Sequence, residues 1–172
     1  TLNSDLSYEL VESLTTEVGP RMMGTPGDAK AIVWAVEKMK SLGFDKVWTE
    51  EVTGTQWIRG KAEAKITAPF PHNVVAIALG GSVGTGENGL TAQVVHFEDL
   101  DALKAAKSGS LKGKIAFVSY KMERHIAGKG YGAAVGTRVN GATISAANCA
   151  DALIIRPLGT ASKRAGDAGA MG

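Results

Sequence analysis

The side chains in this chain that could bind a metal ion are its three histidines and the carboxylates near them. A zinc site needs three or four His, Cys, Asp or Glu side chains that converge at about 2.0–2.3 Å from the ion. His96 and Glu98 are two positions apart in a strand-like run, so they share one face. His72 follows a proline and His125 lies in a polar stretch, so both are expected at the surface. Because no second ligand pair accompanies His96, we expect no metal site in this chain.

The sequence has no recognisable nucleophile or phosphate-binding motif. The sequence contains no Gly-x-Ser-x-Gly turn of the kind that presents a catalytic serine. Cys149 ends an alanine-rich helix just before an apolar strand, which indicates a small buried residue. The glycines at 128, 130, 132 and 136 and the pair Gly113-Lys114 lack dinucleotide-loop or phosphate-loop spacing, and we expect turns there. Arg21 is expected to bond loop carbonyls.

The paired carboxylates offer no acid–base site either. Glu50 and Glu51 are adjacent in a predicted strand and point to opposite faces, so they cannot converge. Asp99 and Asp101 lie where a helix is expected to begin, and Asp99 suits its N-cap. The residues alone therefore identify no catalytic, cofactor-binding or metal-binding side chain.

Two helices are predicted at the start of the chain. The first has apolar residues at nearly every fourth position from 6 to 18, Ser7 as its N-cap and a Gly-Pro pair as its stop. The second has Thr25 as N-cap, Pro26 in its first turn and Gly43 at its end. Its predicted apolar face consists of Ala29, Ile32, Val33, Val36, Met39 and Leu42.

The remaining residues read mainly as short strands. Strand-like composition occurs at 46–52, 57–59, 62–67, 73–79, 91–97, 114–120 and 152–155, with helices at 99–106 and 140–149. The fold class is therefore α/β (α+β), and composition divides the chain near residue 68. The predicted core of the second part consists of Val94, Val95, Ile115, Phe117, Val118, Leu153, Ile154 and Ile155. The alanine-rich face of the helix at 140–149 should pack on that sheet.

The overall composition is that of a folded domain with no specialised partner surface. The chain has 172 residues, 44% hydrophobic and 21% charged, with a formal net charge of +2. Without a basic block it should bind neither nucleic acid nor a membrane surface. No apolar run approaches the roughly 20 residues of a membrane span. The chain begins with Thr1, so either a signal peptide has been removed or the chain has been cut.

Several segments, in order, resemble a known enzyme family. Residues 17–27 read Glu-Val-Gly-Pro-Arg-Met-Met-Gly-Thr-Pro-Gly, and a helix and Leu-Gly-Phe at 42–44 follow. This resembles the opening of the zinc-dependent aminopeptidase family that includes carboxypeptidase Q. Segments 57–60 and 79–85 resemble the passage into an inserted domain. Residues 90–155, especially 111–118, 141–150 and 152–156, resemble a protease-associated domain.

The resemblance implies an incomplete enzyme. Residues 1–68 would be the N-terminal part of a catalytic domain, and 69–172 a protease-associated domain that is incomplete at its C-terminal end. The family's His-x-Asp motif and its other zinc ligands would lie further along the chain, so no catalytic or metal residue is carried over. Residues 167–171 read Asp-Ala-Gly-Ala-Met where relatives carry His-Thr-Gly-Ala-Met, which puts that loop's usual contacts in doubt.

The parent protein is then expected to be a secreted or periplasmic exopeptidase. Two zinc ions would polarise the scissile carbonyl of a peptide substrate and activate water, with a Glu as general base. This part alone is expected to be inactive and free of zinc, and to form a homodimer or associate with the missing catalytic segment. The alternatives are a stand-alone protease-associated domain that binds a protein or peptide, and a glycine-rich globular domain. A His-x-Asp motif after residue 172 would favour the peptidase.

Overall fold

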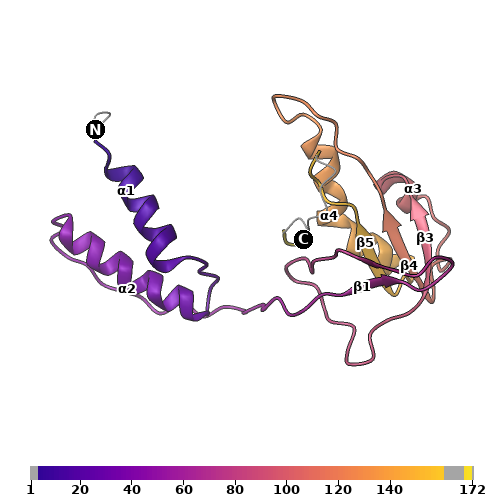
Figure 1. Cartoon of the computed structure of the whole chain (residues 1–172), viewed down its shortest axis with the longest axis horizontal. Helices are drawn as coiled ribbons and strands as arrows, with labels where there is room; N and C mark the ends of the chain where they lie inside the picture. The colour runs from indigo at the N-terminus through magenta and orange to yellow at the C-terminus, as the bar shows by residue number, and fades with distance from the viewer. Residues whose placement is uncertain (1–3, 161–168, 172) are drawn as a thin grey trace. The chain divides into compact units, whose positions relative to one another are not determined.

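The computed structural model describes residues 4–160 and 169–171, and the chain forms two compact units, Thr1–Gln56 and Trp57–Gly172. Figure 1 shows the elements of each unit. The expected division at residue 68 falls inside the second unit. The assignment of the two parts to a catalytic and a protease-associated domain stays a prediction.

The first unit begins with a helix that changes its winding. Helix α1 (Leu6–Ser13) continues into the π-helical turn η1 (Leu14–Val18), and Gly19 ends it with φ +73°. This φ value lies in the region that glycine adopts without steric cost. The expected N-cap Ser7 is wrong: the helix starts two residues earlier than this cap implies, with Asp5 at the cap position and Ser7 inside the first turn.

The second helix begins as the sequence predicts. Helix α2 (Pro26–Ser41) has Thr25 as its N-cap, whose Oγ1 accepts a hydrogen bond from the Asp28 N–H at 3.3 Å. Pro26 occupies the first helical position, where its missing N–H costs nothing. Gly43, with φ +82°, follows the helix and confirms the predicted stop.

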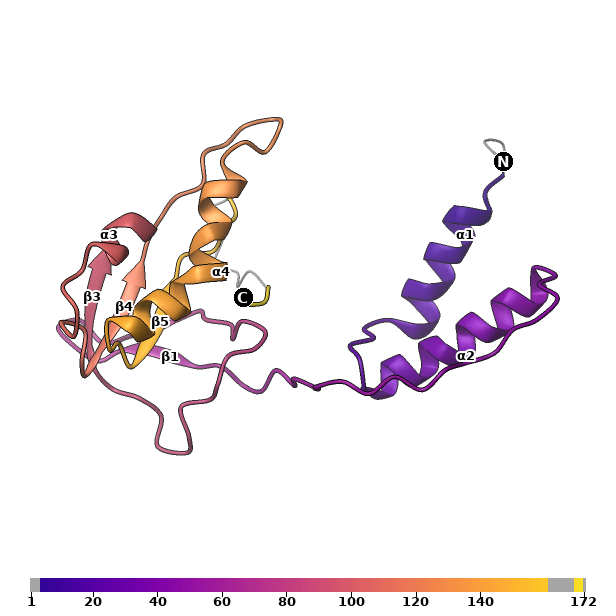
Figure 2. The same ribbon diagram turned by 180° about the vertical axis from the view of Figure 1, so that it is seen from behind.

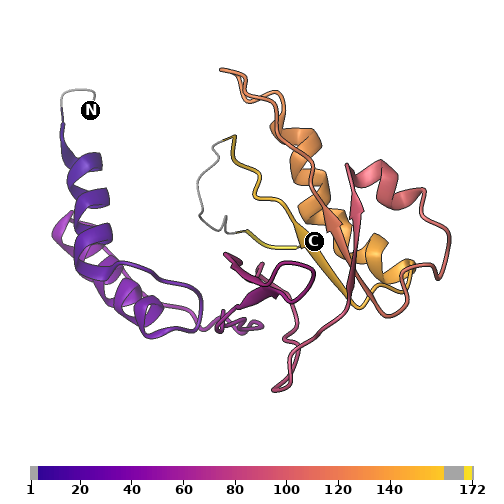
Figure 3. The ribbon, with the colours of Figure 1, turned by 45° about the vertical axis from the view of Figure 1, so that its right-hand side comes forward.

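A chain of hydrogen bonds joins the two helices, which lie at an angle to each other in Figures 1 and 3. Trp34 Nε1 donates to Ser13 Oγ at 2.8 Å, and Ser13 Oγ donates to Glu17 Oε1 at 2.6 Å. Much of the predicted apolar face of α2 remains open within this unit, since Ile32 is 49% and Val33 58% exposed. The contact between the helices therefore uses Trp34 more than that face.

The strands expected at 46–52 and 57–59 do not form. Trp48 is 71% and Val52 79% exposed, so these residues have no surface to pack on within the unit. A strand is stable only when a neighbouring strand pairs with its backbone groups. β-Propensity alone therefore gave the wrong prediction here.

Among its described residues, the second unit holds five short strands in two sheets. Strands β1 (Ala64–Ile66) and β2 (His72–Val74) form an antiparallel pair. The larger sheet is parallel, with the order β3-β4-β5: β3 (Gln93–Phe97), β4 (Lys114–Val118) and β5 (Ala152–Ile155). Its three strands confirm the predictions for 91–97, 114–120 and 152–155, and the mixed α/β fold class is confirmed.

Two helices connect these parallel strands. Helix α3 (Leu100–Lys104) is capped by Asp99, whose Oδ1 accepts from the Ala102 N–H at 2.8 Å. Helix α4 (Tyr131–Ala147) starts nine residues before the predicted 140. The glycines at 132 and 136 therefore lie in a helix, and the turn predicted for them is wrong. In the described part of the chain no helix is long and apolar enough to cross a bilayer.

Small residues let α4 approach the sheet closely. Its buried positions are Ala134, Thr137, Gly141 and Ser145. A Cβ at Gly141 would lie 2.8 Å from Leu153 Cδ2 on β5. A larger residue at 141 would therefore clash with Leu153 unless one of the two moved. The predicted packing of the alanine-rich helix on the sheet is confirmed, and Figures 1 and 2 show it from two sides.

The core lies between the parallel sheet and these helices. It is built around Leu103, Leu111, Ala116 and Val118, with Val95, Phe97, Leu100, Tyr120, Ile144, Ala150, Leu153 and Ile155 packed against it. Side chains alternate between the faces of a strand. Val94, Ile115, Phe117 and Ile154 therefore fall on the opposite face, and their inclusion in one shared core was wrong. Val94 is 50% and Ile154 41% exposed.

Candidate functional site

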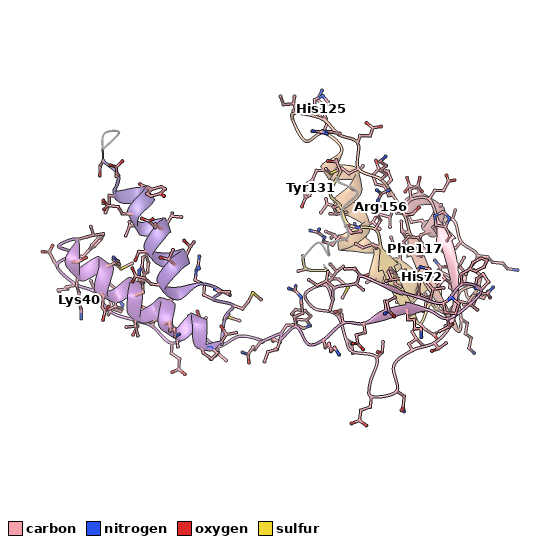
Figure 4. All side chains as sticks on the ribbon, viewed as in Figure 1. Lys40, His72, Phe117, His125, Tyr131 and Arg156 are labelled. Atoms are coloured by element: carbon pink, nitrogen blue, oxygen red, sulfur yellow. The ribbon has the colours of Figure 1, made fainter. Side chains whose placement is uncertain are left out.

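Two of the three histidines lie at the surface and make only local contacts. His72 Nδ1 is 2.8 Å from the Phe70 carbonyl oxygen, and His125 Nδ1 accepts from the Ala127 N–H at 3.0 Å. Both rings are exposed, as predicted. Figure 4 shows His125 at the tip of the loop before α4, well away from His72. These two histidines cannot share an ion.

His96 lies on β3 and contacts the neighbouring strand. Its Nε2 is 2.6 Å from Ser119 Oγ, and its ring centroid is 5.7 Å from that of Phe117. His96 and Glu98 are both exposed. Across residues 4–160 and 169–171, no group of three or more His, Cys, Asp or Glu side chains could hold a metal ion. The described residues therefore do not fit a zinc centre, and no zinc-dependent step is assigned to them.

We predict that the isolated chain retains well under one equivalent of zinc after dialysis. The reason is that His96 would have at most Glu98 beside it, and two ligands do not hold zinc tightly. Elemental analysis of the dialysed chain measures this directly. Stoichiometric zinc that disappears in a His96→Ala variant would contradict the prediction.

The other candidate side chains have structural surroundings. Cys149 is exposed and has φ +62°, because it follows the C-cap of α4 in the left-handed region; the expected burial is wrong. Arg21 Nη1 donates to the Gly19 carbonyl at 2.6 Å, which confirms its predicted role. Glu50 Oε1 accepts from Trp48 Nε1 at 3.0 Å. None of these contacts forms a reactive pair.

An exposed ion pair lies just before β1. Lys61 Nζ is 2.6 Å from Glu63 Oε1, and both side chains are mostly in solvent. The hydrogen bond to Glu63, together with its negative charge, raises the pKa of Lys61 above its ordinary value. An exposed pair of this kind contributes little to stability and marks no site.

The segment that opens the family resemblance, 17–27, contains a tightly built loop at 19–25, between η1 and α2. Asp28 Oδ2 accepts from the Gly24 N–H at 2.8 Å, and Gln56 Nε2 donates to the Gly24 carbonyl at 2.9 Å. A Cβ at Gly27 would overlap the Pro20 carbonyl oxygen. The loop thus depends on a glycine at 27. Of the departure at 167–171, Asp167 and Ala168 lie outside the described residues.

The second unit contains two cavities of note. The larger, about 560 Å³, is lined by Lys121, Met122, Glu123, Arg124 and Thr160. The smaller, about 260 Å³, lies between α3 and α4, and its lining includes Asp99, Tyr120 and Thr137. Sequence reasoning missed the second one. Its only sequence signal is that Asp99 and Tyr120 each follow a parallel strand by two residues.

Known protein families and structures were compared with the chain. No model of a known family matches it. Carboxypeptidase Q of Homo sapiens is 34% identical over 109 residues, 63% of this chain. Carboxypeptidase Q of Bos taurus is 31% identical over 156 residues, 91% of this chain. The crystal structure of a peptidase M28 precursor from Shewanella amazonensis is 48% identical, covers 98% of this chain and superposes with a TM-score of 0.89.

The chain spans only part of these proteins. It covers 23% of the human carboxypeptidase Q, 32% of the bovine one and 38% of the Shewanella chain. The similarity therefore concerns about a third of a longer protein. It extends over the described loop at 17–27 and over both units.

Proposed function

This chain belongs to the family of M28-type peptidases that includes carboxypeptidase Q, and from that premise we propose that it is the N-terminal, non-catalytic part of a zinc-dependent exopeptidase. The parent protein would hydrolyse peptide bonds near a chain end, with two zinc ions held by residues outside this chain. The observation that carries the proposal is the match of nearly the whole chain to about a third of a peptidase of known structure. We further propose that the parent is secreted or periplasmic.

The second unit would act as a cover or interaction surface and not as a reaction site. Its described residues lack a metal-binding cluster, and its candidate side chains are engaged in turns, caps and cross-strand contacts. A protease-associated domain inserted into an exopeptidase has this role in the family that the sequence resembles. We therefore propose that the catalytic residues lie in the rest of the parent protein. The second unit of this chain would cover the active site or bind a partner.

The test is to express the protein encoded by the intact reading frame beside the 172-residue chain. The intact protein should hydrolyse dipeptides, lose that activity in a chelator and recover it with added zinc, whereas the chain alone should stay inactive under the same conditions. A reading frame that ends at residue 172 would favour the stand-alone binding module. Hydrolysis by the 172-residue chain itself that a chelator does not stop would show that this chain is catalytic and would overturn the proposal.

We propose that the open face of α2 is covered in the parent by the catalytic segment, and we predict that the isolated chain self-associates through it. Burial of apolar surface is worth about 25 cal/mol per Å², and an open patch of this kind promotes association. Exposed apolar side chains of the first unit include Leu6, Val11, Ile32, Val33, Met39, Leu42 and Phe44.

Sedimentation velocity over a range of concentrations measures this association. Ile32→Lys should shift the chain toward monomer, because it places a charge in the middle of the face. Val83→Lys is the matched control: Val83 is 93% exposed in the second unit, so the same charge should change nothing. A wild-type chain that stays monomeric at every concentration would count against the open face as an interface.

A further inference from the structure

We propose that the face of the parallel sheet opposite α3 and α4 binds the segment of the parent protein that follows residue 172. The inference rests on the proposed function, because it requires a parent that continues beyond this chain. We call this face the outer face of the sheet; its apolar residues are Val94, Ile115, Phe117 and Ile154. Val94 pairs with Ile115 and Phe117 pairs with Ile154, so the four side chains form one patch.

The sequence of the strands is typical of a sheet that is covered on both faces. Sheets made only of parallel strands occur almost exclusively with both faces buried, and their strands are apolar without alternation. Residues 115–118 and 152–155 are apolar at every position. Helices α3 and α4 cover one face, around Ala116 and Val118. The apolar residues of the outer face therefore indicate that a second layer belongs there.

Within the described part of the chain, the outer face remains in contact with solvent. Val94 is 50% and Ile154 41% exposed, and Phe117 is only partly buried. The polar residue next to this patch is His96, whose ring lies 5.7 Å from that of Phe117 and whose Nε2 is 2.6 Å from Ser119 Oγ. Because this nitrogen already has a partner, a covering segment needs at most one polar group opposite His96. The occupant is therefore expected to be mainly apolar.

The chain leaves the second unit from a fixed point. The Gly80 N–H donates to the Gly169 carbonyl at 2.6 Å, and the Met171 N–H donates to the Gly80 carbonyl at 2.9 Å, so 169–171 run parallel to Gly80. Arg138 of α4 lies against this segment, because a Cβ at Gly169 would be 2.5 Å from Arg138 Nη1. The continuation of the parent would therefore start on the unit that carries the outer face.

This starting point favours the parent's own segment over a second copy of the chain. The chain covers 38% of the Shewanella peptidase, so more than half of such a protein lies outside it. A segment tethered to the same unit binds at an effective concentration of about 1 mM when its linker can span the distance. A second copy must bind from dilute solution and would lose this competition in the parent.

The test compares hydroxyl-radical labelling of the 172-residue chain and of the intact parent, measured residue by residue by mass spectrometry. Phe117 and Ile154 should be labelled in the chain at a concentration where sedimentation shows a monomer, and several-fold more slowly in the parent. Equal labelling in both proteins would overturn the proposal. Protection that appears in the chain alone as its concentration rises, and that the parent lacks, would assign the face to a second copy and would also overturn it.

A lysine at position 154 tests whether the covering segment buries this face. In the 172-residue chain Ile154→Lys should change the melting temperature little, because residue 154 is 41% exposed and the ammonium can stay hydrated. In the parent the same charge would be buried, so the melting temperature should fall by several degrees more. Val83→Lys is the matched control: Val83 is 93% exposed, and its small effect should be the same in both proteins.

The outcomes separate this inference from the proposed function. If the parent is a chelator-sensitive peptidase but Ile154→Lys has the same effect in the parent and in the chain, the outer face is not covered and only this inference fails. A reading frame that ends at residue 172 would refute the proposed function and this inference with it.

Discussion

Replacing Val118 by Asp is expected to unfold the second unit. Val118 is 1% exposed and is the last residue of β4, the middle strand of the parallel sheet, with Leu103 and Leu111 in the same core. A carboxylate there loses its hydration and gains no cationic partner from this apolar cluster. The expected loss is about 3–5 kcal/mol, which is a large part of the stability of a domain of this size. Thermal denaturation followed by circular dichroism measures it.

Two control substitutions test whether the loss depends on burial of the new charge. Ile154→Asp introduces the same group on the neighbouring strand β5, but Ile154 is 41% exposed on the other face of the sheet, so the charge can stay hydrated. Its expected loss is about 1 kcal/mol. His125→Ala should change stability by less than about 0.5 kcal/mol, because that ring is exposed. Equal melting temperatures for Val118→Asp and Ile154→Asp would show that the two faces of the sheet are assigned wrongly.

The strands of the parallel sheet could be predicted from the sequence, but the face on which each side chain lies could not. Runs such as 115–118 are apolar throughout, so their strand character was evident while the face on which each side chain lies was not. Burial of Ala116 and Val118 follows from where α3 and α4 dock, and that is set by tertiary packing. The sequence therefore predicted the three strands of the parallel sheet correctly but placed half of the eight named core side chains on the wrong face.

Local signals with a stereochemical cause were the most dependable. Thr25 and Asp99 were predicted as caps because a side-chain oxygen can accept a first-turn N–H, and both do so in the structure. Propensity was less reliable: 46–52 forms no strand, and the glycines at 132 and 136 lie within α4. Such residues follow the packing available to them, which a single sequence does not reveal.

Features that depend on how the helices and strands pack could not be predicted from the sequence either. The cavity between α3 and α4 gave almost no signal in the sequence, because Asp99, Tyr120 and Thr137 come together only when the helices pack on the sheet. Composition led us to expect no zinc cluster, since three separated histidines offer no convergent set. Chemistry that depends on residue types was therefore easier to predict than chemistry that depends on burial.

Replacing Gly27 by Ala is expected to destabilise the first unit by at least about 2 kcal/mol. In most helices the change would help, because alanine is favoured over glycine by about 1 kcal/mol. Here the new Cβ would overlap the Pro20 carbonyl oxygen, a backbone atom that cannot move without opening the loop at 17–27. The clash outweighs the propensity gain because the neighbouring atom belongs to the chain and not to a flexible side chain. Tryptophan fluorescence during urea unfolding measures this loss, because two of the three tryptophans, Trp34 and Trp48, lie in this unit.

Gly132→Ala is the matched control for this prediction. Gly132 is also the second residue of a helix, α4, but a Cβ there meets nothing within 4 Å. Alanine at 132 should therefore leave stability unchanged or raise it by up to about 1 kcal/mol. If both substitutions stabilise the chain, the loop at 17–27 does not bring Pro20 against the start of α2. Loss confined to Gly27→Ala would show instead that the segment carrying the family resemblance requires glycine at 27 for a steric reason.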